Sequence, residues 1–162
     1  MDRKVWIVGG AVLMLILAGG ALMYKSYRNR YGKRLVLLNV LFEKFQAMKK
    51  ALAYKGIDIE MTDAWRGEAD QNAAYQSGYS KALFGMSPHN FGAAFDVAPL
   101  IGGSLTWTAP DYVWAQIAEA GKAQGLTWGG DFSSIVDKPH FELKGWKSEN
   151  LVLLKTAPNG VA

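Results

Sequence analysis

The chain has 162 residues, half of them hydrophobic and a fifth charged, which suits one folded domain with a sizeable core. Its net charge of +4 arises at the N-terminus, because residues 1–34 carry seven basic and one acidic side chain and the rest sum to −2, which leaves no basic face for nucleic acid. The absence of cysteine excludes disulfides, thiolate metal sites and a cysteine nucleophile.

The first predicted element is a transmembrane helix over residues 5–24, VWIVGGAVLMLILAGGALMY. This segment carries no charge, and its twenty residues correspond to about 30 Å of helix, the thickness of a bilayer's hydrocarbon core. Trp6 and Tyr24 stand near its ends, where aromatic rings favour the interface. Residues 1–4 are then an N-terminal flank, and residues 25–34 a basic juxtamembrane linker.

The sequence leaves the fate and orientation of this helix open. The small residues at 18–21 also suit a signal peptidase, and the glycine and alanine content weakens membrane retention, so a removed signal peptide and a segment released from the bilayer are the alternatives to a retained anchor. Five basic residues follow the segment within ten positions and two precede it, so the positive-inside rule favours a cytoplasmic C-terminus. The function that the motifs below indicate requires the opposite side.

The rest of the chain predicts short strands interspersed with helices. These elements are an amphipathic helix over 33–54, a strand over IDIEMTDAW, a short helix in EADQNAAYQSGYSKA, a buried strand AAFDVAPL, a helix in PDYVWAQIAEAGKAQG, a short strand and turn in LTWGGDF, and a last strand HFELK. This mixture predicts an α+β domain over residues 35–155, followed by a flexible tail at 156–162.

Both histidines of the chain lie close to acidic residues. A hydrolytic zinc site takes three protein ligands and leaves a position for water, and His89, Asp96 and His140 would supply such a set. Residues seven apart point to opposite faces of a plain strand, so the chain has to bend between His89 and Asp96, and Gly92 permits that bend. Iron also suits two histidines and a carboxylate.

Two further residues suit a hydrolytic mechanism. Asp137 precedes His140 by three positions and would take a proton from the activated water, and Arg66 would stabilise the oxyanion on the attacked carbonyl. The structural alternatives are an Asp96 that caps a turn and an Arg66 that pairs with a nearby surface acid, Asp63 or Glu68. A serine triad of Ser87, His89 and Asp96 is disfavoured because no nucleophile elbow surrounds the serine.

Four ordered motifs resemble the zinc-dependent D-alanyl-D-alanine carboxypeptidase and L-alanyl-D-glutamate endopeptidase family. They are Ser87-x-His89-x-x-Gly92-x-Ala94-x-Asp96, Asp137-x-x-His140, the segment WGGDF, and the upstream WRGEADQNAAYQSGYSKA. The resemblance implies that one Zn²⁺ ion binds His89, Asp96 and His140. It also implies that Asp137 is the general base, that Arg66 polarises the carbonyl, and that Ser87 lines the substrate site.

Asp137 and the segments WGGDF and PHFE resemble the sequence pattern of the endopeptidase branch of this family. That branch includes phage endolysins. The resemblance implies a small α+β fold with a central antiparallel sheet flanked by helices, shared with the Hedgehog signalling domain. The expected substrate is the peptidoglycan stem peptide, cut between L-alanine and D-glutamate. The alternatives are a D,D-carboxypeptidase and a catalytically silent binding domain.

A membrane-anchored wall enzyme follows from the span and the resemblance together. We expect a single-pass protein of the inner membrane whose catalytic domain faces the periplasm and the wall. Its expected partners are peptidoglycan and the membrane, and not nucleic acid. The sequence leaves the oligomeric state open.

Overall fold

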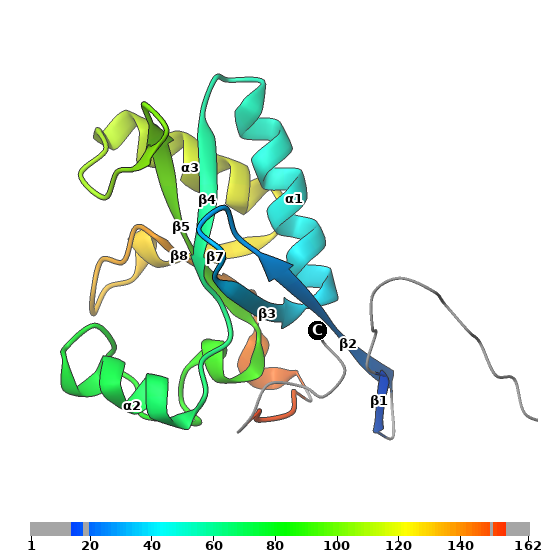
Figure 1. Cartoon of the computed structure of the whole chain (residues 1–162). Helices are drawn as coiled ribbons and strands as arrows, with labels where there is room; N and C mark the ends of the chain where they lie inside the picture. Colours follow the sequence, from blue (N-terminus) through cyan, green and yellow to red (C-terminus); the bar gives the residue numbers. More distant parts are fainter. Residues whose placement is uncertain (1–13, 18–19, 150, 155–162) are drawn as a thin grey trace, which may run out of the picture.

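The computed structural model describes residues 14–17, 20–149 and 151–154 (Figure 1). The centre of the fold is an antiparallel sheet with the strand order β4-β5-β8-β7, in which the short β6 also pairs with β5. The strands are β4 (Asp58–Asp63), β5 (Ala94–Ile101), β6 (Ser104–Leu105), β7 (Leu126–Trp128) and β8 (His140–Leu143).

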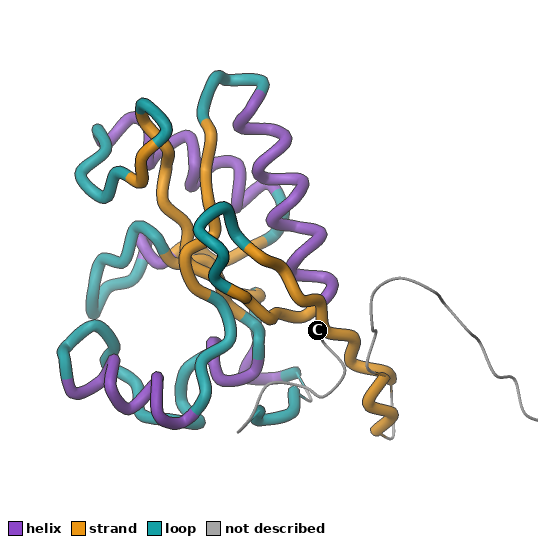
Figure 2. Tube along the Cα trace, in the orientation of Figure 1, coloured by secondary structure: helices purple, strands orange, loops and turns teal. Residues whose placement is uncertain are grey.

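Two helices, α1 (Asn39–Ala53) and α3 (Asp111–Ala123), pack on the sheet and on each other, whereas α2 (Glu68–Gln76) lies apart in Figure 1. The apolar stripe of α1 is buried, as the periodicity predicts. Figure 2 shows helices and strands in one fold, and because the central sheet is antiparallel throughout, the predicted α+β class is confirmed.

Along the two central strands, successive side chains point alternately into the core and towards the site. Phe95 of β5 pairs with Phe141 of β8, and both are fully buried with ring centroids 5.8 Å apart. The next pair along the strands is Asp96 with His140, which points to the opposite face because successive side chains of a strand alternate. Core packing on one face therefore fixes the register of the polar residues on the other.

The predicted first helix begins later than expected. Residues 34–38 form strand β3 (Arg34–Leu38), and the helix starts at Asn39. Leu35 to Leu38 form an uninterrupted apolar run, and all four side chains are buried. A short continuous apolar run fits a buried strand as well as a helix, and periodicity does not separate the two.

Residues expected as a linker belong to the folded domain. A three-stranded antiparallel sheet joins β1 (Met14–Leu17), β2 (Gly20–Arg28) and β3. Tyr24 of β2 is 1% exposed, and the β2–β3 pairing extends to the pair of Arg28 with Arg34. The folded unit thus begins before residue 35, because Tyr24 completes its core.

Part of the expected transmembrane segment lies outside the described residues, at 5–13 and 18–19. Where the segment is described, Met14–Leu17 and Gly20–Tyr24 are strands rather than a helix, because their backbone groups pair with neighbouring strands. None of the helices within the described part of the chain has the length and apolar character that a membrane span requires.

A buried carboxylate ties β2 to the central sheet. Glu60 of β4 is 2% exposed and accepts a hydrogen bond of 2.7 Å from the Tyr27 hydroxyl. It also forms ion pairs with Arg30 at 3.2 Å and with Lys49 at 3.6 Å. A buried charge is costly unless it is paired, so these contacts tie residues 27–30 to β4 and stabilise the domain.

Candidate metal centre and active-site groove

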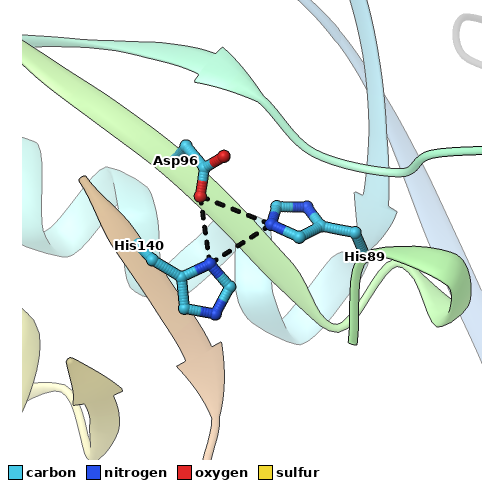
Figure 3. Close-up of side chains that lie close together, drawn as sticks. All are labelled: His89, Asp96 and His140. Carbon is cyan, nitrogen blue, oxygen red and sulfur yellow. Dashed lines mark hydrogen bonds and ion pairs between the residues drawn. The ribbon is translucent and has the colours of Figure 1, made fainter. Parts of the chain in front are cut away.

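Three different elements bring the predicted ligands together (Figure 3). His89 lies in the short 3-10 helix η1 (Pro88–Phe91), Asp96 in β5 and His140 at the start of β8. Gly92 ends η1 in the left-handed conformation with φ of 65°. That turn supplies the predicted bend between His89 and the strand that carries Asp96.

The three donor atoms form a compact triangle. His89 Nε2 lies 3.2 Å from His140 Nδ1, and Asp96 Oδ1 lies 3.3 Å from the first and 3.0 Å from the second. Tetrahedral ligands with bonds of about 2.0 Å, as zinc has, are about 3.3 Å apart. The residues present therefore fit one metal ion of this kind.

Both imidazole rings have a partner on the side away from the triangle. His89 Nδ1 lies 2.5 Å from the carbonyl oxygen of Ala64, so it carries the proton and leaves the lone pair on Nε2. His140 Nε2 lies 3.3 Å from Glu142 Oε2, which leaves the lone pair on Nδ1. Such outer partners orient metal-binding histidines.

Arg66 joins two carboxylates across the sheet. Its Nη2 donates a hydrogen bond of 2.9 Å to Asp96 Oδ2, and its Nε donates to Asp63 Oδ2. The pairing with Asp63 that was the structural alternative is thus present, but all three side chains are at most 24% exposed. Arg66 therefore neutralises two neighbouring charges and orients the free oxygen of Asp96.

A β-bulge places Asp63 on the site face. Met61 of β4 pairs with Val97 of β5. Two residues further along β4, Asp63 pairs with Asp96, which is only one residue away from Val97. The extra residue, Thr62, donates its hydroxyl to the Asp96 carbonyl at 3.2 Å. A bulge re-aims a side chain, and here it turns Asp63 towards Arg66.

Ser87 begins η1 and is nearly buried. Its Oγ accepts a hydrogen bond from the backbone N–H of His89, while the Asn90 side chain accepts one from the Ser87 N–H, which together make a capping box. Ser87 also lines the groove described below. Its hydroxyl contacts the backbone of His89 rather than the imidazole ring, which faces Asp96 and His140.

Asp137 lies in the loop that leads into β8 and faces the same groove. Its N–H donates to the carbonyl of Gly129, the first residue of η2 (Gly129–Asp131). A Cβ on Gly129 would lie 2.5 Å from the Asp137 carbonyl oxygen and 2.9 Å from His140 Cβ. The glycine of WGGDF therefore permits the close approach that holds Asp137 beside the ligands.

The charges of the site move the pKa values of its ionisable groups away from their usual values. Burial alone would raise the pKa of Asp96, but the charges and hydrogen bonds of His89 and His140 outweigh it and hold that pKa well below its usual range. Burial would lower the pKa of His140, but Asp96 and Glu142 raise it to about 9. Burial and the charge of Asp96 raise the pKa of Asp137, as suits a group that takes up and returns a proton.

A groove of about 1080 Å³ runs over this centre. The three ligand residues lie in it together with Arg66, Ser87 and Asp137, so the structure brings all the predicted site residues to one cavity. Tyr79, Trp107 and Ile135 add largely exposed apolar surface to the walls. The groove has the size and mixed lining of a binding site for an extended ligand.

An α+β domain with a His-Asp-His centre, a second carboxylate and an arginine in one groove is a metal-dependent hydrolase in class. The sequence profile of the D-alanyl-D-alanine carboxypeptidase family matches residues 80–143. The peptidoglycan L-alanyl-D-glutamate endopeptidase CwlK of Bacillus subtilis (strain 168) is 32% identical, over 64% of this chain and 71% of CwlK. The chain belongs to this family of metallopeptidases.

Other relatives agree with this assignment. The L-alanyl-D-glutamate peptidase of Listeria phage A118 is 31% identical, over 74% of this chain and 44% of the phage protein. The L-Ala D-Glu endopeptidase ChiX of Serratia marcescens has a similar structure, with a TM-score of 0.54 and 27% identity over 65% of this chain and 81% of ChiX. The D,D-pentapeptidase VanY, solved with Zn(II), shares the fold with a TM-score of 0.54 at 16% identity, over 76% and 80% of the two chains.

Sequence reasoning missed two residues that contact the site. Asp63 was considered only as a surface partner of Arg66, because a bulge leaves no clear signal in the strand pattern. Glu142 stands two residues after His140 in a strand, and residues two apart share a face. That spacing is a signal that identifies Glu142 once His140 is taken as a ligand.

Proposed function

We propose that this protein is a zinc-dependent endopeptidase that hydrolyses the L-alanyl-D-glutamate bond of peptidoglycan stem peptides. The observation that carries the proposal is the donor triangle of His89, Asp96 and His140 on the floor of an open groove. Relatives that are 27–32% identical are named for this bond, which favours it over the terminal D-alanine bond.

The residues around the triangle divide the work of hydrolysis. A bound zinc ion would polarise the carbonyl and lower the pKa of its water to about 7. Asp137, which faces the same groove, accepts the proton of the attacking water and returns it to the departing amine of D-glutamate. Arg66 keeps Asp96 ionised and in place, and its positive charge stabilises the oxyanion that develops on the carbonyl.

Digestion of purified peptidoglycan, with the products read by mass spectrometry, tests the bond specificity. The proposal predicts new C-terminal L-alanine and new N-terminal D-glutamate, in equal amounts. Release of D-alanine alone would instead assign a D,D-carboxypeptidase. Intact stem peptides with a zinc-loaded protein would indicate a silent domain.

We also propose that the N-terminal apolar segment holds the enzyme at the inner membrane, with the catalytic domain on the wall side. Support comes from the uncharged residues 5–23 and the basic residues on both flanks. In a bilayer this segment would have to be helical, because backbone groups need internal partners there, so strand β1 and the first residues of β2 would form only outside the bilayer. The span would end before Tyr24, which is buried in the domain.

A topology reporter fused to the C-terminus tests this location. The proposal predicts a signal from a reporter that is active only outside the cytoplasm, together with recovery of the chain in the membrane fraction. A cytoplasmic reporter signal would contradict the orientation, and recovery of the full-length chain in the soluble fraction would contradict the anchor.

A further inference from the structure

Glu142 is a half-buried carboxylate for which the proposed mechanism has no use. It lies on β8 two residues after His140, so both side chains project from the same face of the sheet. Its Oε2 lies 3.3 Å from His140 Nε2, and its side chain is 16% exposed. We propose that Glu142 is a positioning residue that fixes the tautomer and the orientation of His140 for metal binding.

The need for such a residue follows from which nitrogen faces the centre. His140 Nδ1 lies 3.0 Å from Asp96 Oδ1 and 3.2 Å from His89 Nε2, so Nδ1 is the ligand atom. A neutral imidazole has one N–H and one lone pair. To offer the lone pair on Nδ1, His140 has to carry its proton on Nε2, and that buried N–H requires an acceptor. Glu142 supplies the acceptor.

The two histidines are held by different means. The acceptor for His89 is the backbone carbonyl of Ala64, which every residue at that position would provide. The acceptor for His140 is a side chain, so one substitution removes it. The ring of Phe132 also packs near His140, with centroids 5.8 Å apart, but an aromatic ring sets no tautomer. Metal affinity should therefore depend on the chemistry at position 142.

This inference rests on the metal site of the proposed function but not on the substrate. The test uses the full-length chain and its variants Glu142→Ala and Glu142→Gln, and Glu43→Ala is the matched control because Glu43 is exposed on α1. The zinc dissociation constant is measured by competition with a chromophoric chelator. The visible spectrum of the Co²⁺ form reports the geometry of the ligands.

We expect Glu142→Ala to raise the zinc dissociation constant 10–100-fold, the usual effect of losing an outer partner of a metal ligand. Glu142→Gln keeps an acceptor oxygen, so its dissociation constant should rise less than tenfold and its Co²⁺ spectrum should stay close to the parent's. Glu43→Ala should bind zinc like the parent. Melting of the metal-free proteins checks that the variants are folded.

Two results would overturn the inference. The first is a Glu142→Ala protein that binds zinc within twofold of the parent. The second is a Glu142→Gln protein that binds zinc as weakly as Glu142→Ala, because the glutamine retains the acceptor. Neither depends on peptidoglycan, so a parent protein that binds zinc and leaves stem peptides intact would contradict the proposed function alone.

Discussion

Arg66 lies between two carboxylates that face each other across the sheet. Asp63 and Asp96 form a cross-strand pair, and like charges in that position repel. The guanidinium donates to both, so it converts an unfavourable pair into a connected network. The Lys33 ammonium adds a further contact to Asp63, at 2.9 Å. The residue proposed to stabilise the oxyanion thus also holds Asp96, the carboxylate of the proposed metal site.

Arg66→Met should destabilise the metal-free protein because it leaves the two carboxylates opposed. We expect the free energy of unfolding to fall by about 2 kcal/mol. This is less than the roughly 3–5 kcal/mol lost when a fully buried ion pair is broken, because these side chains keep some solvent contact. Adding Asp63→Asn should restore part of that loss. Urea unfolding of the single and double variants measures it, with the exposed Arg28→Met as the control. Equal losses in the single and double variants would contradict the network.

If zinc binds at the proposed centre, its affinity should depend on pH through His140. Its pKa in the metal-free protein is raised to about 9, so below that pH a proton has to leave before Nδ1 binds a metal. Zinc affinity should fall by up to about tenfold for each unit that the pH drops below about 9. Chelator competition at several pH values between about 6.5 and 9 tests this slope, and a flat profile would contradict it.

The raised pKa of His140 also makes the stability of the metal-free protein depend on pH. A pKa that is higher in the folded state than in the unfolded state stabilises the fold at low pH. The contribution of His140 is therefore fully present below its ordinary value of 6.5 and is lost as the pH rises to about 9. Added zinc should offset that loss, because the metal then binds the deprotonated ring.

Among the helices and their connections, two glycines allow close packing, one in the core and one at the site. A Cβ on Gly121 of α3 would lie 2.2 Å from the ring of Phe141, in the core. A Cβ on Gly129 would instead collide with the backbone of Asp137 and with His140. Both positions require glycine for close approach, but the first concerns packing and the second concerns the site.

Gly129→Ala should therefore lower activity, and it should also destabilise the fold because its Cβ would meet the Asp137 backbone. Displacing a general base typically costs a factor of about 100 or more in turnover. Gly121→Ala should lose about 1–3 kcal/mol from overpacking in the core, while the folded protein keeps its activity. Peptidoglycan hydrolysis and urea unfolding, measured on both variants, separate the two effects. Full activity in a folded Gly129→Ala protein would contradict the placement of Asp137.

The sequence predicted the elements that carry complete local signals. The helix over Asp111–Ala123, bounded by Pro110 and Gly125, and the bend at Gly92 are found where expected. Strand β3 and the β-bulge before Asp63 were not predicted, because both depend on which strand lies alongside. The triangle of ligands was inferred from two histidines and a motif, but its closure required the register of β5 on β8.

At the scale of the whole molecule, the folded unit reaches further towards the N-terminus than the composition indicated. Basic residues between 25 and 34 look like a solvated linker in the sequence. In the structure Lys33 and Arg30 pair with acids of β4, and Tyr24 completes the core. The N-terminal strands are thus coupled to the sheet that carries the site.

Two truncations test this boundary. A chain that begins at Gly20 keeps β2 and should melt within a few degrees of the parent. A chain that begins at Tyr31 loses the burial of Tyr24 and leaves Glu60 without two of its partners. The lost burial of Tyr24 and the lost partners of Glu60 should each lower the free energy of unfolding by about 2 kcal/mol. The melting temperature should therefore fall by about 10 °C or more. Equal melting temperatures for the two chains would contradict the boundary.

The most direct test of the catalytic centre combines metal removal with one substitution. The parent protein and Asp137→Asn are stripped with a chelator, reloaded with one equivalent of zinc, and assayed on peptidoglycan. We expect the parent to lose and regain its activity, whereas Asp137→Asn should bind the same equivalent of zinc and stay at least about 100-fold less active. Activity that survives stripping, or a zinc-loaded Asp137→Asn as active as the parent, would contradict this expectation.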